Sequence, residues 1–177
     1  MLRSMTIVSV SIGSVAFGCA RLPVEAESMT KRHRIDDRVS LAVPSDWEIW
    51  EPSDDTLFVA AAPEFGRDDL QPHFFVTRDT TESRSSQESM VGNVAYLQSH
   101  QDGYVEHEII QFDANGHDIA CVVYDAPASE WVFRTKQYFI VVDGVEYLIT
   151  CKMLPEQAAK WSGDFDRIAK SVKIIER

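Results

Sequence analysis

The side chains best suited to chemistry in this sequence are its histidines and cysteines. His107 stands between Glu106 and Glu108 in a segment with the composition of a strand. Alternate side chains of a strand point to opposite faces, so the histidine lies on one face and both glutamates on the other. The three side chains therefore cannot converge on one metal ion, and the other histidines show no H-x-x-H spacing. We expect a structural or surface histidine and no metal site.

Two further candidates, Cys121 and Cys151, are expected in strands on either side of the strand at 132–142. Pairing of Tyr124 with Trp131 gives this arrangement and separates the cysteines by two strand spacings, about 9–10 Å. A disulfide needs a Cα separation below about 7 Å. We therefore predict two reduced, mostly buried thiols. A catalytic cysteine would need an activating histidine or cation, and in this register Arg134 faces Cys121 and Lys136 faces Cys151. Because a base and an orienting group are also required, we favour the structural thiols.

No other motif points to an enzyme or to a cofactor. No serine stands in G-x-S-x-G, and the glycines form no phosphate-binding loop. The sequence has 177 residues, of which 45% are hydrophobic. This composition is sufficient for one hydrophobic core, and the chain is too short for two ordinary domains. The net charge of -11 argues against a nucleic-acid partner. Much of the acid stands in loop pairs such as Asp36–Asp37, which predicts a solvated surface.

Residues 1–28 have the pattern of an export signal. Arg3 precedes the apolar stretch Thr6–Phe17, and Gly18–Cys19 follows. A secretory signal typically has a short basic start, an apolar run of about a dozen residues and a small residue before the cleavage site. The apolar run here is too short to span a bilayer, which takes about 20 apolar residues. Gly18–Cys19 resembles the lipobox of bacterial lipoproteins, whose cysteine is the lipid anchor. The alternative is translation from Met29, which gives a cytoplasmic protein; we favour Cys19 as the anchor.

Alternating apolar residues and turn signals predict a protein rich in β-structure. Residues 29–34 lack an apolar period and are expected to form a tether. Strands are expected at 39–43, 47–50, 57–61, 73–78, 104–112, 119–124, 132–142 and 145–153.

The two-residue turn Asp143–Gly144 determines the register of the last hairpin. Large apolar side chains fall on both faces of this hairpin, so we expect a helix on each face of the sheet. The predicted pairs are Val142 with Val145, Ile140 with Tyr147, Tyr138 with Ile149, and Phe139 with Leu148.

Two segments supply these helices. Ser85 and Glu88 fit a capping box at the start of the first helix. The second helix is expected to break at Gly163 and restart with Asp164 as its cap. The predicted apolar faces are Met90, Val91, Val94 and Leu97, and then Phe165, Ile168, Ala169 and Val172. The expected fold is α+β, a central antiparallel sheet covered by helices on both faces, in a single domain over 35–175.

The order of several short motifs resembles the PsbP-like α-β-α sandwich superfamily. These are the Pro-x-x-Trp of Pro44–Trp47, Val76–Asp79, Gly116, Tyr147–Thr150 and Ser171–Ile174. The likeness covers about 34–175 and is greatest for the bacterial branch with LpqN-type lipoproteins and Eag-type chaperones of type VI secretion effectors. It implies a non-enzymatic accessory, scaffold or chaperone protein without catalytic residues to carry over.

We therefore expect a binding or scaffold protein, anchored to the cell envelope, that contacts another protein through its sheet face or an edge strand. Trp50 is the candidate contact residue, since tryptophan is enriched at binding hot spots. Packing of Trp50 beneath a loop is the simpler alternative. The alternative function is a cytosolic chaperone-like adaptor, starting at Met29, that holds a hydrophobic segment of an exported protein. A small-ligand binder or an enzyme is less favoured.

Overall fold

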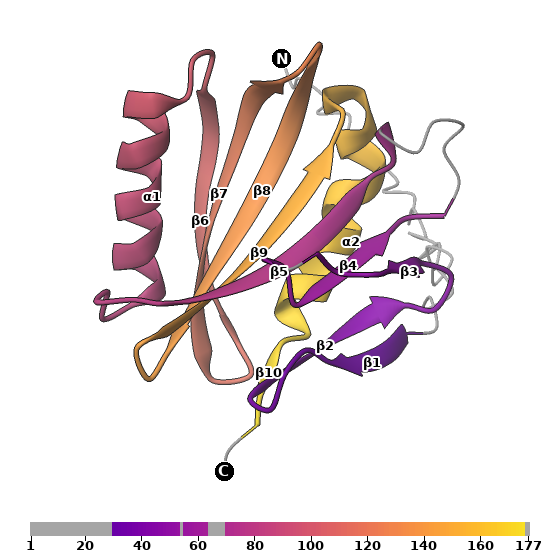
Figure 1. Ribbon diagram of the computed structural model, residues 1–177, viewed down its shortest axis with the longest axis vertical. Coiled ribbons are helices and arrows are strands. Elements are labelled where there is room, and N and C mark those ends of the chain that lie inside the picture. The colour runs from indigo at the N-terminus through magenta and orange to yellow at the C-terminus, as the bar shows by residue number, and fades with distance from the viewer. Residues whose placement is uncertain (1–29, 54, 64–69, 176–177) are drawn as a thin grey trace, which may run out of the picture.

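Two antiparallel sheets and two helices make up the part of the chain that the computed structural model describes, which is residues 30–53, 55–63 and 70–175. The larger sheet has seven strands in the order β3-β4-β5-β9-β8-β7-β6. Figure 1 shows helix α1 at the left, beside β6, and helix α2 behind β5 and β9. The strands are β3 Glu48–Trp50, β4 Phe58–Ala61, β5 His73–Thr80, β6 Val105–Ala114, β7 His117–Ala128, β8 Trp131–Val142 and β9 Val145–Met153.

A smaller sheet holds β1 (Thr30–Arg34), β2 (Val39–Pro44) and β10 (Lys173–Ile174) in the order β1-β2-β10. The expected tether over 29–34 is wrong for its last five residues, because they form β1 and pair with β2 from Thr30↔Pro44 to Arg34↔Ser40. β1 is an exposed edge strand, so backbone pairing holds it without any apolar period in its side chains.

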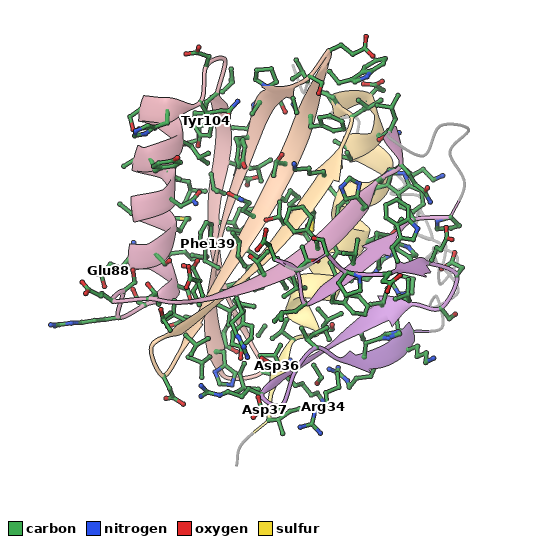
Figure 2. The ribbon with its side chains drawn as sticks, viewed as in Figure 1. Arg34, Asp36, Asp37, Glu88, Tyr104 and Phe139 are labelled. Carbon is green, nitrogen blue, oxygen red and sulfur yellow. The ribbon has the colours of Figure 1, made fainter. Side chains whose placement is uncertain are left out.

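Helix α1 (Ser86–His100) covers part of one face of the large sheet. Ser85 caps it by accepting a hydrogen bond from the Glu88 N–H, as the sequence predicts. Met90 and Val94 are buried against Phe139 of β8 and its neighbours, and Figure 2 shows Phe139 beside the helix. Val91, expected on the buried face, is exposed because it lies a quarter turn away from Met90.

Helix α2 (Ala158–Lys170) covers the opposite face, after a 3-10 turn at Pro155–Gln157. The predicted break at Gly163 is wrong: the helix runs through it without interruption. Asp164 therefore caps nothing and forms an ion pair with Arg167 one turn on. The predicted stripe is confirmed, since Phe165, Ile168, Ala169 and Val172 are all buried.

The hairpin registers test the pairing rules directly. All four pairs expected between β8 and β9 are confirmed, from Val142↔Val145 to Tyr138↔Ile149. The pair Tyr124–Trp131 is wrong, because β7 runs on to a tight turn after Ala128, which pairs with Trp131. Cys121 consequently faces Tyr138. Both cysteines are nonetheless buried and unbridged, as predicted.

Most of the core lies between the large sheet, α2 and the small sheet. Trp47 of the Pro-x-x-Trp motif is buried there, with edge-to-face contacts to Trp161 (5.9 Å between ring centroids) and Phe165 (5.5 Å). The α1 side has a smaller core of six buried residues. The expected α+β fold with a helix on each face is confirmed, although each helix covers only part of its face.

Candidate functional site

One row of cross-strand neighbours runs across all seven strands on the α1 side of the sheet. One member of this row, Val122 of β7, is buried under α1. Side chains that are paired directly across neighbouring strands share a face, so the registers place the whole row on that side. The row is Trp50, Val59, Phe75, Thr150, Gln137, Val122 and Ile109.

Helix α1 covers only one part of this face. It packs on β7 and β8, and Figure 1 shows no helix over the near side of β9 and β5. Elsewhere on this face, Trp50, Val59, His73, Phe75 and Lys152 are partly exposed, whereas Thr150 and Gln137 are buried. We call this region the uncovered face; it consists of Trp50, Val59, His73, Phe75, Gln137, Thr150 and Lys152.

Aromatic rings form a continuous strip along one side of the uncovered face. Trp50 stacks on His73 at 6.1 Å between ring centroids, and His73 stacks on Phe75 at 6.5 Å. The Lys152 ammonium lies 5.8 Å from the centre of the Phe75 ring, a cation–π contact. The strip is therefore mainly apolar, with one positive charge beside it.

The His73 imidazole is held in its neutral form. Burial lowers its pKa, and the nearby Lys152 charge lowers it further, against the opposing hydrogen bond to Gln71. Its Nδ1 lies 2.8 Å from the Gln71 carbonyl oxygen. A neutral ring stacked between two aromatic side chains suits apolar contact.

Gln137 borders the strip beside α1. Its side chain is 9% exposed, and Nε2 donates to Thr150 Oγ1 at 3.4 Å. Oε1 has no hydrogen-bond partner among the described residues, and neither has Asn93 Oδ1 on α1. An unpaired buried acceptor costs about 1–3 kcal/mol.

Trp50 lies half-buried at the end of the strip, on the opposite side of β3 from the exposed Ile49. Its role in partner binding stays a prediction. His73, Phe75 and Lys152 were not singled out from the sequence. Side chains alternate between the two faces of a strand, so the sequence 73–78 indicates that His73 and Phe75 share one face. Only the strand order shows that this is the α1 side of the sheet. Cys19 lies outside the described residues.

His107 makes structural contacts. A β-bulge between Glu106 and Glu108 interrupts the regular alternation expected there. His107 Nε2 lies 2.8 Å from Asp125 Oδ2, and Arg134 holds the same carboxylate at 2.8 Å. The Arg134 hydrogen bond lowers the pKa of Asp125 despite its partial burial, and His107 adds to the effect. The described residues contain no group of three or more side chains that could hold a metal ion.

A buried polar cluster lies under α2. Asp166 Oδ1 accepts hydrogen bonds from Lys136 Nζ at 2.5 Å and from the Tyr138 hydroxyl at 2.6 Å. Burial raises the pKa of the nearby Cys121 thiol to about 12, and burial also raises the pKa of Cys151. Both thiols therefore stay protonated and weakly nucleophilic at neutral pH.

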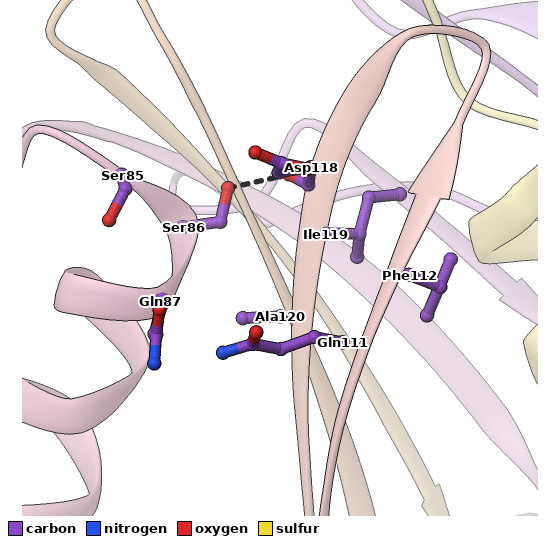
Figure 3. Close-up of a pocket in the computed structure, with 8 residues that line it drawn as sticks. All are labelled: Ser85, Ser86, Gln87, Gln111, Phe112, Asp118, Ile119 and Ala120. Carbon is purple, nitrogen blue, oxygen red and sulfur yellow. Dashed lines mark hydrogen bonds between the residues drawn. The ribbon is translucent and has the colours of Figure 1, made fainter.

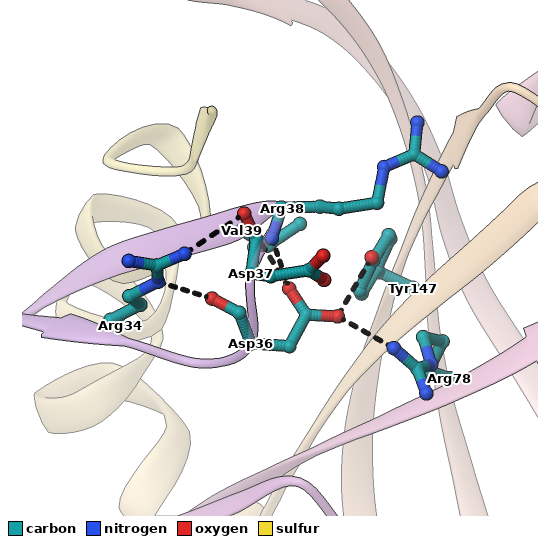
Figure 4. A network of polar contacts seen from close by, with 7 residues as sticks. All are labelled: Arg34, Asp36, Asp37, Arg38, Val39, Arg78 and Tyr147. Atoms are coloured by element: carbon teal, nitrogen blue, oxygen red, sulfur yellow. Dashed lines mark hydrogen bonds and ion pairs between the residues drawn. The ribbon is translucent and has the colours of Figure 1, made fainter. Parts of the chain in front are cut away.

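Asp36 links the two sheets (Figure 4). Its Oδ1 accepts from the Arg38 and Val39 N–H groups, both at 2.8 Å. Its Oδ2 accepts from the Tyr147 hydroxyl at 2.9 Å and from Arg78 at 3.0 Å. Asp36 was expected in a solvated acidic loop, yet its side chain is only 11% exposed. It joins the β1–β2 hairpin to strands β5 and β9.

A small pocket lies beside the start of α1 (Figure 3). Its volume is about 130 Å³, below the roughly 300–1,000 Å³ typical of ligand sites. Ser86 Oγ at its wall is already used, since it donates to the Asp118 carbonyl at 2.8 Å and accepts from the Val141 N–H at 3.1 Å. In the described part of the chain, no helix is long and apolar enough to span a bilayer.

Sequence comparison finds no matching family model and no similar curated protein. Similar structures were found. LpqN of Mycobacterium tuberculosis, involved in cell envelope biogenesis, has a TM-score of 0.63 at 12% identity, over 78% of this chain and 83% of LpqN. Cyanobacterial PsbP from Synechocystis has a TM-score of 0.59 at 13% identity, over 93% of this chain and 99% of that protein.

A protein of unknown function from Pseudomonas aeruginosa has a TM-score of 0.58 at 14% identity, over 84% of this chain and 97% of that protein. The chain therefore has a PsbP-like fold, as its motif order predicts. Likeness at this level of identity concerns the fold alone.

Proposed function

We propose that the protein is a non-enzymatic binding or scaffold protein that holds a segment of another protein on its uncovered face. The observation that supports this most directly is the strip of half-buried aromatic rings, Trp50, His73 and Phe75, over which none of the described helices packs. Trp50 and Phe75 would contact apolar side chains of the segment.

We place the protein in the cell envelope, anchored through a lipid on Cys19. The lipobox-like Gly18–Cys19 supports this, and the similar fold of LpqN, itself involved in cell envelope biogenesis, agrees with it. A cytosolic chaperone-like adaptor that starts at Met29 and binds a hydrophobic segment of an exported protein would use the same face. The intact mass of the native protein separates the two: a lipidated chain starting at Cys19, or an unmodified chain starting at Met29.

Site-specific photo-crosslinking tests the binding surface. A benzoylphenylalanine at position 75 should form a discrete protein adduct in the native host, whereas the same group at position 132, on the exposed end of β8, should not. Trp50→Ala should reduce the yield of the position-75 adduct at least about fivefold, the change that 1 kcal/mol of lost contact produces.

Ile49→Ala is the matched control, because Ile49 is the exposed neighbour of Trp50 on the opposite face of β3. Gln137→Leu should leave the free energy of unfolding unchanged or higher, since it removes an unpaired buried acceptor. Equal adduct yields from Trp50→Ala and Ile49→Ala, both stably folded, would rule out this face as the binding surface.

A further inference from the structure

Strand β6 forms one edge of the large sheet and pairs only with β7 among the described residues. Nearly all of its ten residues are at least partly exposed. In an antiparallel pair, alternate residues direct their N–H and C=O groups away from the partner, so about five residues of β6 present unpaired backbone groups outward. A regular stretch for pairing runs from Glu108 to Ala114, beyond the bulge.

The side chains around this edge are acidic and apolar. Residues 101–114 contain Asp102, Glu106, Glu108 and Asp113 and no lysine or arginine. Two nearby cations, His107 and Arg134, both bind Asp125. A third, Lys170, lies 5.5 Å from the centre of the Phe112 ring of β6 and leaves the acidic residues of the edge in excess. Glu108 and Asp113 form no ion pair with a described residue.

Exposed apolar side chains accompany these acids on the same edge. Ile109 is 47% exposed and Val105 is 52% exposed. Glu108 lies on the α2 side of the sheet, and Ile109 lies on the α1 side. An added strand would thus meet an acidic residue on one face and an apolar residue on the other, at adjacent positions.

We infer that β6 takes up an extended basic segment of a partner protein as an added strand. Backbone pairing along Glu108–Asp113 supplies the affinity. Lysine or arginine opposite Glu108 and Asp113, with an apolar residue opposite Ile109, supplies the selectivity. A second copy of this chain suits the edge poorly, because it would place one acidic strand against another in a protein of net charge -11.

This surface is separate from the uncovered face. Ile109 and Trp50 stand at opposite ends of the seven-strand row, about 29 Å apart at roughly 4.8 Å per strand. If the uncovered face proves not to bind a partner, strand addition at β6 can therefore still be tested, and the converse also holds. Trp50→Ala should not change binding of the peptide at β6.

Glu108 and Asp113 lie on opposite faces of β6, because alternate residues of a strand share a face. The test therefore uses the full chain and a synthetic peptide, acetyl-Thr-Lys-Val-Thr-Val-Val-Lys-Thr-amide, which as an antiparallel strand places its two lysines opposite Asp113 and Glu108 and a valine opposite Ile109. Binding should slow hydrogen exchange of the outward backbone amides within Glu108–Asp113 and should weaken as salt rises. The same peptide with glutamate in place of lysine should bind at least about tenfold more weakly. A peptide that keeps its lysines but has alternate N-methylated amides should give no protection, because it cannot pair as a strand.

The double variant Glu108→Lys with Asp113→Lys should lower the affinity of the lysine peptide about tenfold. Glu48→Lys, at an exposed position of β3 on the opposite edge of the sheet, is the matched control and should bind normally. The inference is overturned if the peptide binds without protecting β6 amides, or if the N-methylated peptide protects them equally. Protection of the same amides in the free full-length chain would also overturn it, since another part of the chain or a second copy would then already occupy the edge.

Discussion

Asp36 is the residue whose local sequence is least informative about its role. It stands in an acidic pair in a short loop, a context typical of solvated surface, and yet four groups donate hydrogen bonds to its carboxylate. Two of these groups, Arg78 and Tyr147, come from strands far along the chain. Burial alone would raise the pKa of Asp36, but the hydrogen bonds from Arg38, Tyr147, Val39 and Arg78 outweigh it and lower the pKa.

Asp36→Ala should therefore lower the free energy of unfolding by about 2 kcal/mol at neutral pH, since it leaves buried donors without an acceptor. Because the folded state depresses the pKa of Asp36, its contribution is present above about pH 4 and is lost as the pH falls through the folded pKa. The difference between wild type and variant should shrink from pH 7 to pH 3. Urea unfolding at both pH values measures it, with the exposed Asp46→Ala as control; an equal difference at both would contradict the linkage.

At the scale of the elements, two glycines have different roles: Gly103 follows the end of α1, whereas Gly163 lies inside α2. Gly103 follows α1 with φ of 74°, in the left-handed region that favours glycine, and Pro127 closes the space beside it. Gly163, in contrast, lies inside α2, and only Arg167 comes within 4.0 Å of a Cβ placed there. The expected break at Gly163 was wrong because burial of Trp161 and Phe165 against the sheet holds the helix on both sides of the glycine.

Gly163→Ala should consequently raise the free energy of unfolding by up to about 1 kcal/mol, because alanine loses less backbone entropy in a helix. Gly103→Ala should lower it by about 1–2 kcal/mol, because an L-residue is strained at that φ. Thermal unfolding of the two variants and of wild type measures both effects: the midpoint should rise for Gly163→Ala and fall for Gly103→Ala. A destabilised Gly163→Ala protein would instead indicate that α2 bends at this position in solution.

At the scale of the whole molecule, β7 and β9 lie on either side of β8 in the large sheet, and they place Cys121 and Cys151 in one core. Cys121 and Cys151 are completely buried there, and neither forms a disulfide. Reaching either thiol requires separation of α2 from the sheet or of the strands from one another, both of which expose much of the core. Access to the thiols should therefore follow global unfolding.

Both thiols should react with a thiol reagent such as DTNB only as the protein unfolds. We expect negligible labelling of Cys121 and Cys151 in the native protein, and a rise in urea with the same midpoint as the loss of circular dichroism. The variant Cys19→Ser confines the readout to these two residues. Rapid native labelling of either thiol would show that the core opens locally, and recovery of fewer than two thiols under denaturing, non-reducing conditions would reveal a disulfide.

The sequence by itself determined the features that depend on neighbouring residues. The alternation of apolar residues located most strands, the Asp143–Gly144 turn set the β8–β9 register, and Ser85 with Glu88 located the start of α1. These signals are local, since a two-residue turn or a helix cap involves only a few consecutive residues. The order of such elements also predicted the PsbP-like fold that LpqN and cyanobacterial PsbP share.

Only the tertiary structure decided which distant residues meet. The strand order brings Trp50, Phe75 and Gln137 into one row, and the position of α1 over β7 and β8 leaves part of that row uncovered. The β6 edge and the partners of Asp36 likewise depend on segments tens of residues apart. Strand order and helix placement follow from how the whole chain buries its apolar surface, and no short stretch of sequence carries that information.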